Sequence, residues 1–168
     1  MKIYDIFKDE DSLADYLDKN LWDWQGGFSQ VWDLSELVNK PVVLKMTDDE
    51  CYVRFLEFIK LNPKLKHLPT IHDHIVINDC SYILMDKLYY SDKYNNEQAQ
   101  MQGWWEADPC VWKGECGSLD HTLDKLQDFY EDNHKEHSLY WDLRDSNIMQ
   151  DINGELVIID PWSESQCY

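Results

Sequence analysis

The sequence predicts an α+β fold in which strands and helices occupy separate stretches of the chain. Most strand-like runs fall between residues 21 and 88. Within 48–60, and again within 119–130, apolar residues recur at the spacing of a helix. A hairpin signal, Asn153-Gly154 between two apolar runs, follows near the end. A chain of 168 residues has the size of one compact domain, or at most two small lobes.

The first half is expected to alternate strands with one long helix. A short amphipathic helix is predicted within residues 1–20, followed by strands at 21–24, 30–34 and 41–46. A helix is predicted over 48–60, because its apolar residues recur at i, i+3, i+4 and i+7. Strands at 74–77 and 80–88 should pair across Asn78-Asp79.

The second half is expected to hold a loop-rich connection, a helix and a last strand pair. Residues 91–117 mix polar residues, glycines and three tryptophans, which indicates loops with some helix. Leu119, Leu123, Leu126 and Tyr130 then line one face of a helix that Ser118 can cap.

The charge is the most unusual feature of the composition. The chain has thirty-three acidic residues and fifteen basic ones, so its net charge is −18. Direct binding to nucleic acid is therefore not expected. Two interpretations stay open. The acidic surface serves solubility, or it imitates nucleic acid and occupies the basic groove of a DNA-binding protein.

Composition also favours a cytoplasmic protein. The sequence has no apolar run long enough to span a membrane, and its first residues lack the apolar region of a signal peptide. The five cysteines form an odd set without a CxxC pair, which favours reduced thiols over disulfides. Neither His72 with His74 nor Cys110 with Cys116 has the usual spacing of zinc ligands.

The hairpin at Asn153-Gly154 brings two oxygen-bearing side chains together. A type I′ turn with a two-residue loop would place Asn147 directly opposite Asp160. Opposed residues hold their Cβ atoms about 4.5–5.5 Å apart. An amide oxygen and a carboxylate at that separation, together with phosphate oxygens, predict a magnesium site.

Asp142, five residues before Asn147, adds a carboxylate on the incoming loop. In this geometry it can accept a proton from an attacking hydroxyl. The alternative is coincidence, because acidic residues are common in this chain and the spacing alone is not specific.

These residues resemble the catalytic loop and the metal-binding aspartate of protein kinases. The resemblance implies binding of ATP and Mg²⁺, with Asp142 as catalytic base and Asn147 and Asp160 as metal ligands. It also implies that Arg144 lies near the transferring phosphate. The implied fold is a single kinase-like domain over 1–168, with a small antiparallel-sheet N-lobe at about 20–88 and a reduced, mostly helical C-lobe at about 89–168.

The N-terminal half carries the same resemblance in the family's order. The run from Gly26 and Gly27 through Ser29 to Val31 resembles a reduced glycine-rich loop, where small residues let backbone N–H groups approach phosphates. A plain hairpin turn is the alternative. Residues 42–45 resemble the strand that ends in the ATP-binding lysine, which would be Lys45.

Lys45 is a cation at the end of an apolar strand and therefore needs an anionic partner. The resemblance implies ATP phosphate as that partner, with a glutamate on the following helix holding the lysine. Glu57 is the first candidate and Glu50 the second. A solvated lysine and a surface glutamate remain the alternative.

Residues 82–88 resemble the strand that leads into the adenine-binding hinge and include Met85 and Asp86. The resemblance implies that Val31, Val43, Met85 and Met149 sandwich the base, although each also suits an ordinary core.

Two departures from the family flank the acidic residues. Tyr140-Trp141 replaces the usual His-Arg, and Pro161-Trp162 replaces Phe-Gly, which should stiffen the turn. Only residues 161–168 follow Asp160, so the activation segment and the peptide-docking platform are expected to be missing. A substrate would then dock elsewhere, for instance on the tryptophan-bearing segment 103–112.

The sequence therefore predicts a minimal kinase that transfers phosphate to a hydroxyl, with a protein as substrate. Two alternatives stay open: a pseudokinase-like binding protein, and an acidic inhibitor that mimics DNA. The shortened C-terminal half also leaves open a homodimer in which a second copy completes the core.

Overall fold

The computed structural model describes residues 1–25, 29–90, 118–143 and 147–164. It is a mixed α/β structure with an antiparallel sheet and a few helices. The chain divides into two compact units. The first unit holds Met1–Asp49 and Pro69–Lys87, and the second unit holds Glu50–Leu68 and Leu88–Tyr168. The helix after the third strand therefore belongs to the second unit, although sequence order groups it with the strands.

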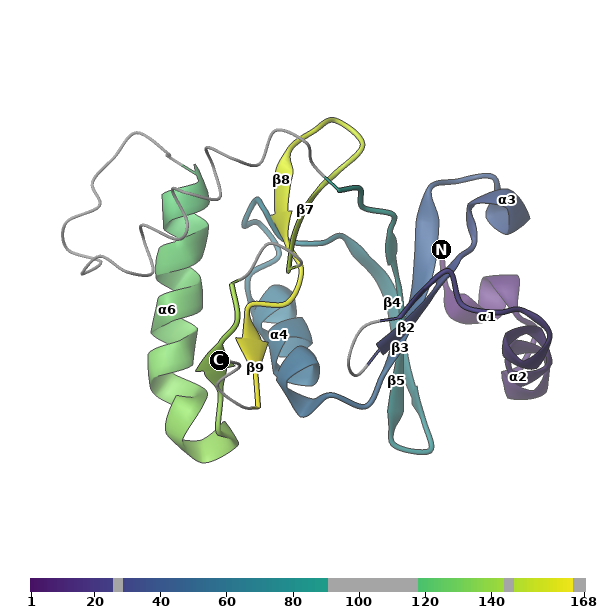
Figure 1. The fold of residues 1–168 in the computed structure, drawn as a ribbon, viewed down its shortest axis with the longest axis horizontal. Coiled ribbons are helices and arrows are strands. Elements are labelled where there is room, and N and C mark those ends of the chain that lie inside the picture. Colours follow the sequence, from purple (N-terminus) through teal and green to yellow (C-terminus); the bar gives the residue numbers. More distant parts are fainter. Residues whose placement is uncertain (26–28, 91–117, 144–146, 165–168) are drawn as a thin grey trace. The chain divides into compact units, whose positions relative to one another are not determined.

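The first unit is built on a five-stranded antiparallel sheet (Figure 1). Its strands are β1 (Trp24–Gln25), β2 (Ser29–Asp33), β3 (Val42–Thr47), β4 (Ile71–Ile77) and β5 (Cys80–Asp86). Their order across the sheet is β1-β2-β3-β5-β4, which makes β3 the central strand. Four of the strands predicted within residues 21–88 are present with ends shifted by up to three residues, whereas the predicted strand 21–24 shares only Trp24 with β1.

The turn between β4 and β5 forms as predicted. Asn78 and Asp79 have φ angles of 49° and 65°, and Ile77 pairs with Cys80 across them. Two consecutive residues at positive φ are the requirement of a type I′ turn, which matches the twist of the flanking strands.

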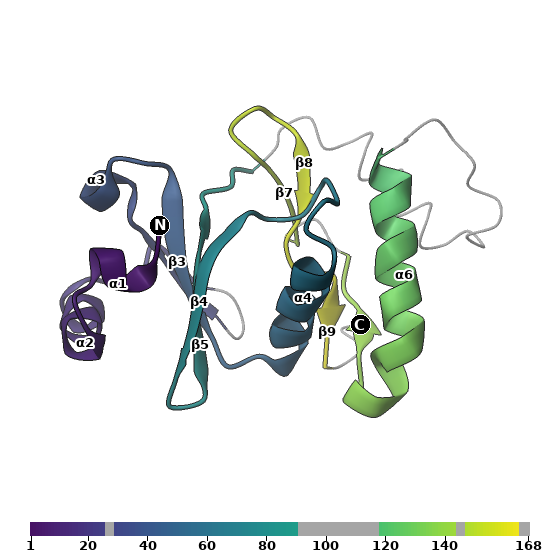
Figure 2. The same cartoon turned by 180° about the vertical axis from the view of Figure 1, so that it is seen from behind.

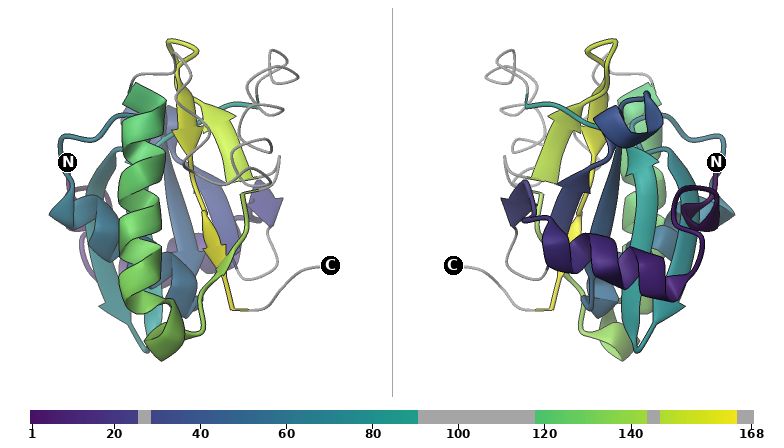
Figure 3. Two further views of the ribbon diagram at one scale, coloured as in Figure 1. Left: turned by 90° about the vertical axis from the view of Figure 1, so that its left-hand side faces the viewer. Right: turned by 90° about the vertical axis from the view of Figure 1, so that its right-hand side faces the viewer.

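Short helices cover one face of this sheet, where α2 crosses the strands (Figure 3, right). They are α1 (Ile3–Ile6), α2 (Glu10–Lys19) and α3 (Ser35–Val38). Apolar side chains from both layers form the buried core of the first unit: Ile3, Phe7, Leu13, Trp32, Leu34, Val42, Leu44 and Leu84. This packing fixes which strand residues face the helices and which face the other way.

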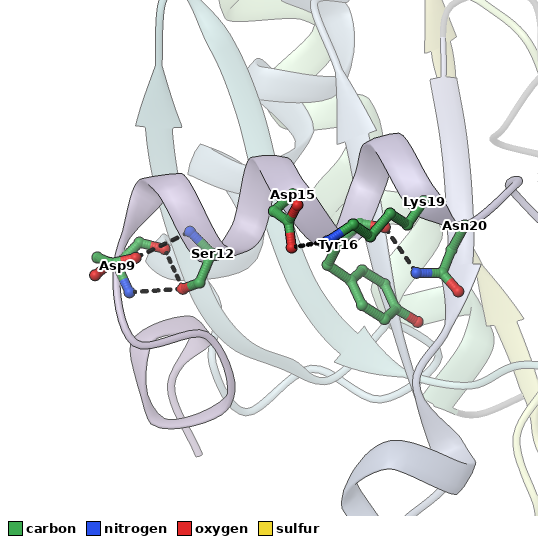
Figure 4. A network of polar contacts seen from close by, with 6 residues as sticks. All are labelled: Asp9, Ser12, Asp15, Tyr16, Lys19 and Asn20. Atoms are coloured by element: carbon green, nitrogen blue, oxygen red, sulfur yellow. Dashed lines mark hydrogen bonds and ion pairs between the residues drawn. The ribbon is translucent and has the colours of Figure 1, made fainter.

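The predicted helix within residues 1–20 is divided into α1 and α2, and α3 was not predicted. Asp9 explains the division, because its carboxylate accepts the Ser12 N–H at 2.9 Å while the Ser12 hydroxyl accepts the Asp9 N–H at 3.0 Å (Figure 4). This reciprocal capping starts a new helix at Glu10. At its other end, the Asn20 side chain donates to the Tyr16 carbonyl at 2.7 Å.

The second unit combines two helices with two short strand ladders. The helices are α4 (Glu50–Leu61) and α6 (Ser118–His137). The ladders pair β6 (Tyr140–Trp141) with β9 (Trp162–Ser163), and β7 (Ile148–Gln150) with β8 (Leu156–Ile158). Strand β9 lies beside α4 (Figure 2).

Aromatic rings form much of the core of the second unit. Trp162 stacks on Phe129 of α6 with ring centroids 5.2 Å apart, and meets Phe55 and Phe58 of α4 edge-on at 6.0 Å. Aromatic pairs in these arrangements stabilise a fold beyond the area that they bury. They also explain why α4 groups with the C-terminal strands rather than with the sheet.

The loop after α4 is tied to the C-terminal elements of the same unit. The Thr122 hydroxyl of α6 donates to the Lys66 carbonyl at 2.9 Å. His67 bonds the Leu156 carbonyl through Nδ1 at 2.8 Å and accepts the Ile158 N–H at 2.9 Å through its own carbonyl. These bonds connect the loop to α6 and β8. Among the described residues, no helix is both long and apolar enough to cross a membrane.

Candidate functional site

The β7–β8 hairpin has a different register from the predicted one. Its pairs are Ile148 with Ile158, Met149 with Val157, and Gln150 with Leu156. Asn147 therefore lies opposite Ile159, whose N–H donates to the Asn147 carbonyl at 2.9 Å. The prediction that Asn147 lies directly opposite Asp160 is wrong by one residue.

The loop of this hairpin explains the shift. Gly154 has a φ of 82°, and Asn153 is not among the residues at positive φ. Asp151 accepts the N–H groups of Asn153 and Glu155 on its carboxylate, each at 2.8 Å. The Gly154 N–H donates to the Asp151 carbonyl at 3.0 Å. The loop is therefore a three-residue connection that ends in a left-handed glycine, in place of the predicted two-residue type I′ turn.

Asp160 lies between the two ladders of the second unit. On one side, Ile159 bonds to Asn147. On the other, the Asp142 N–H donates to the Pro161 carbonyl at 2.8 Å, which continues the β6–β9 ladder by one rung. The segment 159–161, which carries Asp160 between β8 and β9, is thus bonded at one end to Asn147 and at the other end to Asp142. The three predicted residues converge even though the register differs.

Asn147 ties the two ends of this loop together. Its side-chain Nδ2 donates to the Asp142 carbonyl at 2.7 Å and to the Asp142 carboxylate at 3.0 Å. One amide group therefore fixes both the backbone and the side chain of Asp142. A carboxylate is a group that can act as a general base, which is the role that the sequence predicts for Asp142.

Two of these residues carry oxygen atoms of the type that Mg²⁺ takes. With its nitrogen directed at Asp142, Asn147 offers its amide oxygen, and Asp160 offers a carboxylate; these hard oxygen ligands are the type that Mg²⁺ takes. The described part of the chain holds no group of three His, Cys, Asp or Glu side chains that could bind a metal. A magnesium site here would therefore need the Asn147 amide and oxygens from a phosphate or water.

Tyr52 of α4 is a further residue beside Asp160. Its side chain is 1% exposed. Burial, and after it the negative charge of Asp160, raise the pKa of the Tyr52 phenol far above its usual value. The phenol therefore stays protonated and offers an O–H group near this carboxylate.

In the first unit, most predicted nucleotide-binding residues share one face of the sheet. Val31 pairs with Lys45, Val43 pairs with Met85, and Ser29 pairs with Thr47. Directly paired residues point to the same side of an antiparallel sheet. Val42 and Leu44 face the helices. Lys45 and the residues paired beside it therefore face the other side of the sheet. Lys45 is 8% exposed there.

Two predicted residues fall in other positions. The side chain of Asp86 alternates away from that of Met85 and bonds His72 through Oδ1 at 2.6 Å. A contact between Asp86 and a nucleotide would therefore fall to its backbone. Met149 lies in the second unit on β7, paired with Val157 and half-buried.

Glu57 has a partner on its own helix. Its carboxylate accepts a hydrogen bond from Arg54 at 2.8 Å, and the two side chains are 46% and 31% exposed. Glu50, the alternative partner for Lys45, is exposed at the first position of α4. Lys45 belongs to the first unit and Glu57 to the second, so the Lys45–Glu57 pair stays a prediction.

Three predicted site residues, Gly26, Gly27 and Arg144, lie outside the described residues. The segment 103–112, expected as a docking site, does so too.

The sequence did not reveal the roles of Tyr52 and Trp162 beside Asp160. For Trp162 the sequence did contain an indication, because this aromatic residue comes two positions after Asp160 on a strand that is expected to be buried. Tyr52 belongs to the apolar face of a helix, and no pattern distinguishes it there from ordinary core.

The chain matches no protein-family model, and no curated protein matches its sequence.

Proposed function

We propose that the chain is a minimal, protein-kinase-like phosphotransferase that uses ATP and Mg²⁺ and acts on a hydroxyl of a protein. One observation carries the proposal: Asn147 binds both the backbone and the carboxylate of Asp142, while the backbone on either side of Asp160 is bonded to these same two residues. A base held in this way, next to two oxygen ligands, suits phosphoryl transfer, which depends mainly on positioning and charge.

The first unit supports the same proposal. Its five-stranded antiparallel sheet suits the small antiparallel-sheet N-lobe that the resemblance implies. A single face carries Lys45 together with the apolar residues Val31, Val43 and Met85. Apolar side chains suit a purine base, and a buried lysine suits a phosphate.

Each residue would have a defined part in the reaction. The Asp142 carboxylate accepts the proton of the attacking hydroxyl, and Asn147 holds that carboxylate in position. Asn147 and Asp160 supply oxygen ligands on either side of the loop, and Lys45 interacts with phosphate oxygens. Mg²⁺, when bound, would neutralise charge on the phosphate groups.

The test is incubation of the protein with γ-labelled ATP and Mg²⁺, with a cell lysate as the pool of acceptors. We expect label on the chain itself or on a lysate protein. In Asp142→Ala, transfer should be lost while the dissociation constant of Mg·ATP changes by no more than about twofold. In Asp160→Ala, metal-dependent nucleotide binding should weaken as well.

Asp132→Ala is the matched control, because it removes an exposed carboxylate of α6. Its activity should equal that of the wild type. Equal activity in wild type and Asp142→Ala would instead refute the catalytic assignment.

A second candidate is a nucleotide-binding protein of the same fold that does not transfer phosphate. The ion pair of Arg54 with Glu57 favours it, because a glutamate held on its own helix is diverted from Lys45. A thermal shift with Mg·ATP, without any labelled product, would select this candidate.

A further inference from the structure

Trp141 and Trp162 occupy the same rung of the β6–β9 ladder. Their ring centroids lie 6.1 Å apart at an interplanar angle of 57°. Trp141 directly precedes Asp142, and Trp162 follows Asp160 by two residues. The next rung is the bond from the Asp142 N–H to the Pro161 carbonyl. The two acidic residues therefore leave this ladder from neighbouring positions on opposite strands.

Each tryptophan is anchored to a helix by separate contacts. Trp162 is 1% exposed and stacks on Phe129 of α6, with Phe55 and Phe58 of α4 at its edges. Trp141 packs against Tyr130 of α6 at 5.0 Å between ring centroids. A change in either ring should therefore move its strand relative to the helices, and with it the adjoining acidic residue.

The indole at position 162 brings a buried N–H group that its ring packing does not use. The Nε1 of Trp162 is buried and has no hydrogen-bond partner among the described residues. An unpaired buried donor costs free energy that a phenylalanine would not. The size and shape of the indole are then the properties that the site uses, and both tryptophans stand where the chain departs from the kinase pattern.

We propose that Trp141 and Trp162 act as a pair of positioning residues that sets the separation of Asp142 and Asp160. This inference rests on the proposed function, because it gives the two residues a role in phosphoryl transfer. Neither tryptophan contacts substrate; both act through the acidic residues beside them. By the resemblance, Trp141 stands at the second position of the family's His-Arg pair and Trp162 at the second position of its Phe-Gly pair.

The first readout is independent of activity. Amide hydrogen exchange is measured for Asp142 and Ile159 in wild type, Trp141→Phe, Trp162→Phe and the double variant. We expect protection of the Asp142 amide to fall about tenfold in each single variant, with that of Ile159 nearly unchanged. The double variant should lose little more than either single one, because the two rings act as a unit.

Phe58→Leu is the control, since Phe58 touches Trp162 and Phe129 but belongs to neither ladder. It should lower the protection of both amides alike. Equal losses at Asp142 and Ile159 in the tryptophan variants as well would show ordinary core packing and overturn the proposal. Trp141→Phe keeps the test available if Trp162→Phe does not fold.

The second readout is the split between binding and turnover. The two variants Trp162→Phe and Phe58→Leu are compared at equal loss of thermal stability. Trp162→Phe should lower kcat about tenfold or more and leave the dissociation constant of Mg·ATP unchanged. Phe58→Leu should retain kcat. If both variants lose activity in proportion to stability, the positioning role is refuted. If wild type itself transfers no phosphate, the proposed function fails, and the exchange data alone decide whether the pair positions the two strands.

Discussion

The side-chain amide of Asn147 donates to Asp142 twice, to the backbone carbonyl at 2.7 Å and to the carboxylate at 3.0 Å. A single residue therefore closes the loop that carries the candidate base. The bond to the carbonyl fixes the backbone of Asp142, and the bond to the carboxylate sets the rotamer of the base. Both bonds are lost together if the amide is removed.

Asn147→Ala should reduce phosphate transfer by roughly 10²-fold or more, because a misplaced base loses most of its effect. Asn147→Asp should be equally inactive, since it keeps an oxygen ligand but replaces the donor with a charge that repels Asp142. Steady-state kinetics with labelled ATP measure both. Asn153→Ala, on the exposed hairpin loop, is the control and should stay within about twofold of wild type.

The hairpin shows how far sequence reasoning reaches. Asn153-Gly154 correctly marked the connection, and the apolar runs on either side correctly marked the strands. The loop length was wrong because Asp151 captures two backbone N–H groups and extends the turn by one residue. Such side-chain capture is a local competition that spacing alone does not reveal. The difference in register does not separate Asp160 from the other two residues, because the backbone beside Asp160 is bonded to both ladders.

Glu57→Gln should lower transfer more than Glu50→Gln, if Glu57 is the residue that holds Lys45. The two substitutions remove equal charge from the same helix and so control for each other. Arg54→Ala should raise activity or leave it unchanged, because it releases Glu57 from its present partner. Similar losses in Glu50→Gln and Glu57→Gln would show a general effect of charge on α4. The measurement is kcat and KM for ATP in all three variants.

Asp33 should contribute to stability near neutral pH through its pair with Lys87. Burial acts to raise the pKa of Asp33, but hydrogen bonds from Lys87 and Ser35, with the charge of Lys87, outweigh it and lower the pKa. The folded state thus favours the ionised form of Asp33. Its contribution to stability is present above the unfolded pKa of about 3.9 and disappears as the pH falls through the lower pKa of the folded state.

Asp33→Asn should therefore destabilise the protein at pH 7 by about 1 kcal/mol, and by less in acid. Urea unfolding at pH 7 and at low pH measures the difference. Asp15→Asn provides the comparison. The side chains of Asp15 and Lys19 are 61% and 68% exposed, so this ion pair should contribute almost nothing to stability. A pH-independent loss in Asp33→Asn would contradict the ionic explanation.

The tertiary neighbours of the site residues were beyond sequence reasoning. The period of α4 correctly placed Tyr52 and Phe55 on its buried face. It did not indicate that this face meets Asp160 and Trp162, since both units use the same kinds of apolar side chain. The cross-strand row of Val31, Lys45 and Ile83 follows from the two-residue period only once the strands are aligned, and the sequence did not supply that alignment.

Tyr52 should make the protein sensitive to alkali. Burial, and next the charge of Asp160, raise the pKa of its phenol in the folded state. In the unfolded chain it ionises near pH 10, so stability is fully present below that value and falls as pH rises above it. Tyr52→Phe removes this ionisation, and its urea midpoint should decline less between pH 8 and about pH 10.5 than that of wild type. An identical decline in both proteins would mean that the phenol is not held protonated beside Asp160, and would remove Tyr52 from the site.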